Sequence, residues 1–168
     1  MKKINIVLFL AALVAFSACK KDDDMEGTGQ FKLELEHSFG ADAFELNSAN
    51  FYTTASGETV KFSMLKYYVS NVVLTKADGT TWAQPESYYL VDAESPASAL
   101  LTINDVPAGD YTAVSFVLGV DSTRNVSGAQ TGALSTSNGM FWSWNSGYIF
   151  LKPKANAHSR VWVALPTT

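Results

Sequence analysis

Alternation of apolar and charged residues is the feature that most constrains how this chain can fold. In Phe31 to His37 the odd positions are Phe, Leu, Leu and His, while the even positions are Lys, Glu and Glu. A period of two predicts a half-buried β-strand with His37 on the core side. Further β-rich runs are 60–64, 66–74, 88–92, 100–103 and 111–119, the last with Thr112, Val114, Phe116 and Leu118 on one face.

Turn signals separate these runs. Asp78-Gly79 is a strong hairpin signal, and the segment 107–110 (PAGD) supplies a turn before the run at 111–119. There is no internal repeat and no convincing amphipathic helix. The sequence therefore predicts one all-β domain, an antiparallel β-sandwich of immunoglobulin-like or jelly-roll-like type.

The first residues read as a targeting segment. A short positive start, an apolar stretch at 4–16 and small residues before Cys19 resemble a bacterial lipoprotein signal. The resemblance implies cleavage after residue 18, lipidation of Cys19 and attachment to a membrane through the lipid. A plain secretory signal with an incidental cysteine is the alternative. Because Cys19 is the only cysteine, an intramolecular disulfide is excluded.

Residues 19–29 are charged and then contain glycine, which predicts a flexible tether. The Lys-then-Asp run beside Cys19 is similar to the export signal of surface lipoproteins in Bacteroidetes-type bacteria, although a solvated linker explains the same charges. We expect an outer-membrane lipoprotein that faces the periplasm or the cell surface.

Composition argues against a nucleic-acid-binding protein, and the absence of catalytic motifs argues against an enzyme. The chain has 12 basic and 16 acidic residues, so there is no basic field for nucleic acid. It has no phosphate loop, nucleophile elbow or zinc-protease motif, and His37 and His158 are its only histidines. We therefore expect no nucleic-acid partner and no enzyme. Asp121 to Asn125 lacks the glycine and glutamate of a calcium loop, so we interpret it as a polar loop.

The segment 139–150, GMFWSWNSGYIF, is the most aromatic part of the chain. Its rings can pack the core and mouth of the sandwich, because large aromatic side chains contribute most to burial. Alternatively, Trp142 or Trp144 is an electron-rich indole whose oxidation product offers a new ligand atom for copper. If both tryptophans lie on one strand, they share a face.

Four segments together carry a family resemblance: LKYYVSNVVL, YYLVDAESP, VPAGDYTAVSFVLGVDSTRNVSGAQTGAL and GMFWSWNSGYIFLK. In this order they resemble the MbnP-like domain, the copper-associated periplasmic or surface family around methanobactin-linked MbnP. The resemblance is strongest at 119–121 and 140–148. It implies a secreted β-sandwich that binds or handles copper through histidine nitrogens and a tryptophan oxidised to kynurenine. It also implies a di-haem cytochrome c peroxidase-type protein as partner and oxidant.

The candidate metal residues are therefore His37 together with Trp142 or Trp144 in oxidised form. No histidine adjoins either tryptophan, and for His37 a hydrogen-bonded place on the core side remains the alternative to a ligand role. For His158 we expect an exposed position in the tail and no ligand role. A rival hypothesis is a surface module that binds a partner protein or glycan through the same aromatic residues without metal.

The resemblance weakens after Lys152, which gives a domain at 30–152 and a divergent tail at 153–168. A truncated coding sequence and a short natural variant both explain this, so the sandwich is expected to be either incomplete at its C-terminal end or unusually short. Missing strands would expose a sheet edge and an apolar face. Residues 160–165 (RVWVAL) could still pair as an edge strand.

Overall fold

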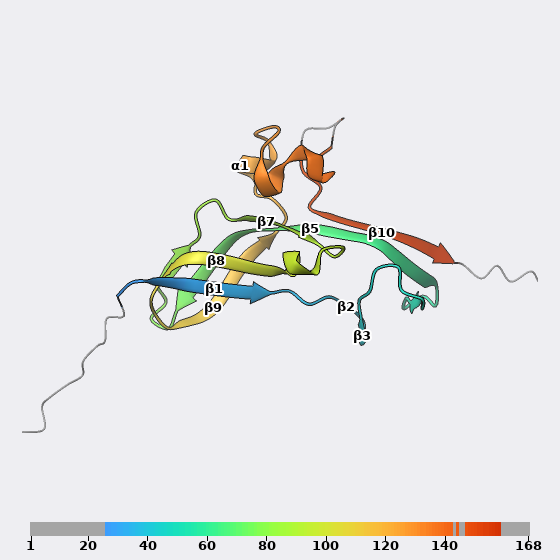
Figure 1. Ribbon diagram of the computed structural model, residues 1–168, viewed down its shortest axis with the longest axis horizontal. Helices are drawn as coiled ribbons and strands as arrows, with labels where there is room; N and C mark the ends of the chain where they lie inside the picture. Colours follow the sequence, from blue (N-terminus) through green and yellow to red (C-terminus); the bar gives the residue numbers. More distant parts are fainter. Residues whose placement is uncertain (1–25, 143, 145–146, 159–168) are drawn as a thin grey trace, which may run out of the picture.

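The computed structural model describes residues 26–142, 144 and 147–158. Its strands and helical turns follow one another along the chain (Figure 1). They are β1 (Thr28–Glu34), β2 (Ser38–Phe39), β3 (Asp42–Ala43), β4 (Tyr52–Thr53), β5 (Thr59–Lys76), β6 (Thr81–Ala83), β7 (Tyr88–Asp92), η1 (Pro96–Ala99), β8 (Leu100–Pro107), β9 (Tyr111–Leu118), α1 (Ser122–Asn125), η2 (Gly132–Leu134), η3 (Thr136–Asn138) and β10 (Leu151–His158).

Strand β5 is the spine of the larger sheet. On one side it pairs with β4, β7 and β6, and on the other with β10 and then β9, all antiparallel. The sequence predicted two runs here, at 60–64 and 66–74, but the structure joins them into one strand of 18 residues. The stretch contains no glycine or proline, and β-branched and aromatic residues favour extended backbone throughout it.

β5 faces two hydrophobic cores, one on each side, and a bulge keeps its apolar side chains on the first of them. Before it, Tyr67 and Val69 face the first core and Tyr68 faces the second; after it, Val72 and Leu74 face the first core. The register shifts between residues 70 and 73, where Asn71 has a φ of 53°. An extra residue in one strand reverses the side-chain alternation, so the same strand keeps its apolar side chains on the first core.

The first core lies between the β5 sheet and a small sheet of β1 paired antiparallel with β8. Leu101, Ile103 and Val106 of β8 are buried against β5 and β7, and Phe31 and Leu33 of β1 pack beside them. The structure thus confirms the all-β sandwich, with one large layer and one small one (Figure 1). The alternating burial of β1 continues to His37, as the pattern predicted.

The second core lies on the opposite face of β5, under the segment that runs from β9 to β10. Tyr68 packs there with Val120, Leu134, Met140 and Tyr148. This segment holds α1, η2 and η3 and forms a lobe above the sheet in Figure 1. It is the part of the fold that carries most of the aromatic stretch.

The structure differs from the sequence expectations at three places. Thr112, Val114, Phe116 and Leu118 share a face of β9 as expected, but every residue from Thr112 to Leu118 is exposed. The interpretation of Asp121 to Asn125 as a loop is also wrong, because residues 122–125 form the short helix α1. In addition, β10 crosses the domain boundary expected at 152 and continues to His158.

Candidate functional site

The aromatic stretch forms a tight hairpin on the lobe. Phe141 bridges to Tyr148, the Trp142 N–H donates to the Gly147 carbonyl (3.0 Å), and the Ile149 N–H donates to the Met140 carbonyl (2.8 Å). Met140 and Tyr148 are buried, and the Tyr148 hydroxyl donates to the Leu134 carbonyl at 2.7 Å. The base of the hairpin is therefore anchored in the second core.

The two tryptophans of this hairpin, which we call the Trp pair, lie outside that core. Trp142 is 41% exposed and Trp144 is 76% exposed. Their ring centroids are 5.1 Å apart with an interplanar angle of 56°. The core-packing interpretation thus holds for Tyr148 and in part for Phe141, whereas the Trp pair presents apolar ring surface to solvent.

Asp121 is the centre of a polar network beneath the lobe. Its carboxylate accepts a hydrogen bond from the Tyr88 hydroxyl, one from Asn71 Nδ2 (3.3 Å) and one from the Arg124 N–H (3.1 Å) that caps α1. The Tyr88 hydrogen bond is the main cause that lowers the pKa of Asp121. Burial, followed by the hydrogen bond to Asp121, raises the pKa of Tyr88 to about 12. The network joins β7, the bulge in β5 and α1.

Helix α1 in turn holds the hairpin in place through Asn125. Asn125 Oδ1 accepts from the Tyr148 N–H at 2.7 Å, directly beside Gly147. Gly147 has a φ of 147°, and a Cβ there would lie 3.2 Å from Asn125 Oδ1. Close packing of the two segments therefore requires glycine at this position. The Trp pair is mounted on a base that Asp121 and Asn125 hold in place.

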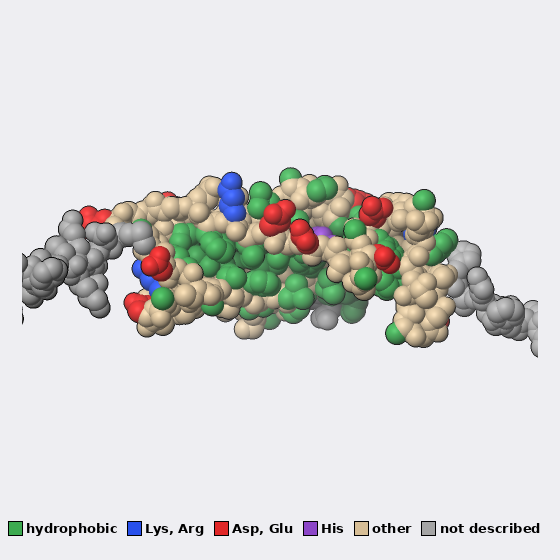
Figure 2. Space-filling model, turned by 90° about the horizontal axis from the view of Figure 1, so that it is seen from below, with side chains coloured by type: hydrophobic (Ala, Val, Ile, Leu, Met, Phe, Trp, Pro, Cys, Tyr) green, Lys and Arg blue, Asp and Glu red, His purple; other side chains and the backbone are tan. Residues whose placement is uncertain are grey.

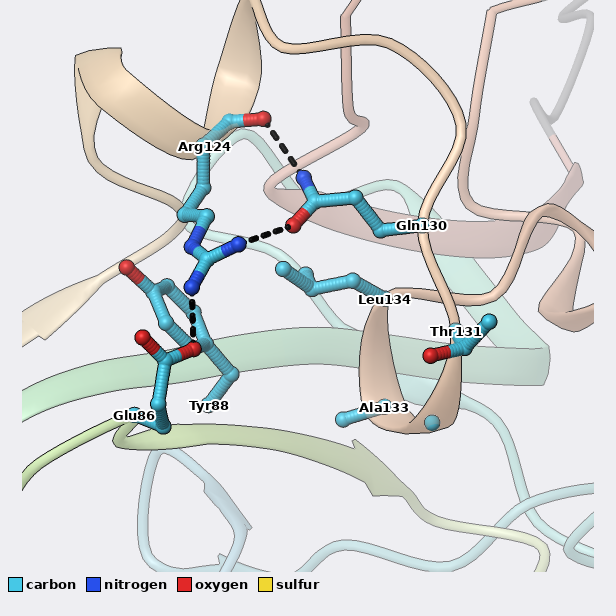
Figure 3. A pocket seen from close by; sticks show the side chains of 8 residues that line it. Glu86, Tyr88, Arg124, Gln130, Thr131, Ala133 and Leu134 are labelled. Atoms are coloured by element: carbon cyan, nitrogen blue, oxygen red, sulfur yellow. Dashed lines mark hydrogen bonds and ion pairs between the residues drawn. The ribbon is translucent and has the colours of Figure 1, made fainter.

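A cavity of about 410 Å³ opens beside this network (Figure 3). Arg124 reaches into it, forms an ion pair with Glu86 and donates from Nη1 to Gln130 Oε1 (3.1 Å). Its guanidinium carbon lies 5.8 Å from the centre of the Tyr88 ring. Because Glu86 and Gln130 already engage the guanidinium, this arginine connects the lobe to the loop between β6 and β7.

His37 lies on the other side of the sheet. Its Nε2 shares a hydrogen bond of 2.9 Å with the Tyr67 hydroxyl, and its ring meets the Tyr67 ring edge-on at 5.6 Å. A cavity of about 260 Å³ adjoins it, with Glu34 and Asp92 in the lining. Asp92 is paired with Lys66 at 2.8 Å. Of the two interpretations, this is the geometry of the hydrogen-bonded histidine on the core side.

The structure does not bring His37 and the Trp pair together. His37 bonds Tyr67, which faces the first core, while the hairpin packs on Tyr68, which faces the second. Within the described residues there is no group of three His, Cys, Asp or Glu side chains that could hold a metal ion. Since copper needs several nitrogen or sulfur ligands, the described residues do not fit a copper site built from His37 and a tryptophan.

The remaining candidate residues fall at or beyond the ends of the described chain. His158 ends β10, where its backbone pairs with Thr59. Cys19, the signal at 1–18 and residues 160–165 lie outside the described residues. No helix in the described part of the chain is long and apolar enough to cross a membrane.

Sequence reasoning missed Asp121 as the organiser of the site. The sequence did point to this residue in one way: the family resemblance is strongest in two segments, at 119–121 and in the aromatic block at 140–148. The structure shows that Asp121 and the block are linked through Asn125 and Tyr148.

Taken together, these features define a two-layer antiparallel β-sandwich that carries an aromatic lobe with two exposed indoles on one face. The model of the MbnP family matches residues 28–162, so the chain belongs to the MbnP family. The match extends beyond Lys152, past the point where the resemblance had weakened. The search of curated proteins and the search of solved structures found no match.

Proposed function

We propose that this member of the MbnP family is a lipid-anchored, extracytoplasmic binding protein without catalytic turnover, and that the Trp pair is its binding element. One observation carries the proposal: two tryptophans stand exposed side by side, 5.1 Å between ring centres, in a hairpin whose base is buried. Exposed aromatic side chains are the usual anchors of recognition surfaces.

Rigidity of the base supports a recognition role. A binding surface gains affinity when its side chains are already ordered before the ligand arrives. Here Asn125 fixes the Tyr148 backbone, and Asp121 fixes α1, on which Asn125 lies. Within the hairpin, the base is buried at Met140 and Tyr148 while the indoles of the Trp pair are exposed. The ligand chemistry that matches them is an apolar C–H face, such as a sugar ring or an apolar side chain of a partner protein.

Anchoring through Cys19 is the second part of the proposal. It rests on the signal-like residues before Cys19 and on the charged segment after it. An acylated cysteine followed by a tether would hold the domain away from an outer membrane, facing the periplasm or the cell surface. Mass spectrometry of the N-terminal peptide tests this, because acylation adds a fixed mass at Cys19 and a plain secretory protein lacks it.

Copper binding or handling is the second candidate function. Family membership favours it, together with the solvent exposure of the Trp pair, which leaves the indoles open to an oxidant such as a di-haem cytochrome c peroxidase-type protein. His37 is the described histidine that such a site would recruit. Because His37 and the Trp pair lie on opposite faces of the sheet, any copper site would need ligands from elsewhere.

The test compares three forms of the chain on a glycan array and against envelope extracts of the producing cells. They are the wild type, the Trp142→Ala/Trp144→Ala double variant and the Val126→Ala control. Val126 belongs to the same lobe and, at 73% exposed, matches Trp144. We expect the double variant to lose at least about tenfold in affinity for the captured ligand while the control keeps it. Equal capture by all three forms would contradict the proposal.

A further inference from the structure

Strand β9 has an open edge that differs from the rest of the fold. Among the described strands it pairs with β5 alone, so the N–H and C=O groups on its other edge are available. The strand is apolar as well as exposed: Val114, Phe116, Val117 and Leu118 are between 36% and 56% exposed. Such an edge is a template for another strand.

The neighbouring edge strand β10 has features that prevent a further strand from pairing with it. It lies on the same side of β5 and contains Lys152, Pro153 and Lys154, followed by a register shift at Ala155. Charges, proline and irregular register are the devices that keep sheet edges from associating. The eight residues of β9 contain no charge and no proline. On this side of β5, β10 therefore has features that prevent a further strand from pairing, whereas β9 has none of them.

An apolar groove accompanies the open edge. Its volume is about 300 Å³, and it is lined by Leu35, Leu65, Tyr67, Val69, Phe116, Leu118 and Leu151. None of these side chains is charged. Figure 2 views the molecule from below Figure 1 and shows a band of hydrophobic side chains across this face. A strand added to β9 would place alternate side chains beside Phe116 and Leu118, at the border of this groove.

The chain's own remaining segments are poor occupants. Leu118 and His158 pair with β5 at Val69 and Thr59, ten residues apart. Strands β9 and β10 both run antiparallel to β5, and β10 ends at the end of β5 farther from β9, so residues 159–168 would have to reverse direction before they could approach β9. Residues 20–26 carry six charges, which do not suit an uncharged edge and groove.

We infer that the open edge of β9 pairs with β9 of a second copy of this chain, antiparallel about a two-fold axis. An isologous contact of this kind requires a surface that complements itself. The uncharged β9 meets that requirement, because no like charges face one another in any register. The paired strands and covered apolar side chains would bury roughly 1,000 Å² in total, which is at the low end of specific interfaces and suits a micromolar dimer.

The experiment uses the full chain, purified in detergent micelles. Ser115→Cys, at the middle of β9, is treated with a short bis-maleimide beside Asn156→Cys on β10 and beside the parent chain, which reports any reaction at Cys19. We expect at least tenfold more cross-linked dimer from Ser115→Cys than from either control. Cross-linking that is equal in all three chains would overturn the inference.

Charge variants complete the test. Leu118→Lys and Val117→Lys, on the two faces of β9, should each reduce the Ser115→Cys cross-link at least tenfold. Leu100→Lys is the matched control, since Leu100 is 43% exposed and lies on β8. All three positions are solvent-exposed, so the variants should fold with unchanged circular dichroism. Dimers that survive both β9 variants, or cross-links to a different protein in place of a second copy, would overturn the inference.

Discussion

Replacing Asp121 with alanine should destabilise the domain by about 3 kcal/mol. The change removes the acceptor for the Tyr88 hydroxyl, for Asn71 Nδ2 and for the capping N–H of Arg124. Hydrogen bonds to a charged group contribute about 1.5–3 kcal/mol each, and an N-cap about 1 kcal/mol. Because Asp121 is partly exposed, water can replace some of these hydrogen bonds in the variant, so the expected loss is smaller than the sum of the separate contributions.

The assay is urea unfolding of the soluble form that begins after Cys19, at pH 7, followed by circular dichroism. Glu94→Ala is the control, because Glu94 is an exposed carboxylate outside the network, and it should change the free energy of unfolding by less than about 0.5 kcal/mol. A loss for Asp121→Ala no larger than that of the control would refute the role we assign to the network.

The same pair of proteins has a defined pH dependence. The Tyr88 hydrogen bond lowers the pKa of Asp121 in the folded state. A lowered folded pKa means that the stabilisation is complete above the unfolded value of about 3.9 and is lost as the pH falls through the folded value. The stability difference between wild type and Asp121→Ala should therefore shrink below about pH 4. A difference that stays constant to pH 2 would contradict this cause.

Three further changes follow from the geometry. Asn71→Val should cost about 1–3 kcal/mol in urea unfolding, because a β-branched residue is strained at a φ of 53°, whereas Asn71→Gly should be milder; equal effects would argue against strain at the bulge. Burial raises the pKa of Tyr68 and Tyr88 to about 12, so stability should be lost as the pH rises above the unfolded value of about 10, and tyrosinate absorbance at 295 nm in the folded state below pH 11 at either site would contradict it. Tyr67→Phe removes the partner of His37 and should cost about 1 kcal/mol in the same unfolding assay, while an unchanged midpoint would show that the bond contributes nothing.

Local patterns carried most of the strand prediction. Alternation located β1, β-rich composition located β7 and the start of β8, and Asp78-Gly79 located the turn between β5 and β6, where Gly79 has a φ of 85°. The continuity of β5 was not predicted, because the apolar alternation changes phase between Met64 and Leu65, where the two predicted runs were divided. Periodicity alone reads such a change of phase as a break between two elements.

The site was harder to predict, since its contacts join residues distant in sequence. Asp121 meets Asn71 and Tyr88, which are 50 and 33 positions away. No local pattern encodes those distances, so the segment was interpreted as a polar loop. Likewise, which rings of the aromatic block are buried depends on the hairpin, which buries Tyr148 and exposes Trp144. Alternation along one strand would have placed the Trp pair on a shared face without showing whether that face is covered.

Copper content measured together with the mass of the tryptic peptide that holds the Trp pair tests the central claim most directly. The protein should come from its native kind of host, in the soluble form that begins after Cys19. If the Trp pair is a recognition surface of intact indoles, the protein will contain no stoichiometric copper, take up none on titration and show an unmodified peptide mass. Bound copper with an oxidation mass on Trp142 or Trp144 would contradict that account and establish the metal site in its place.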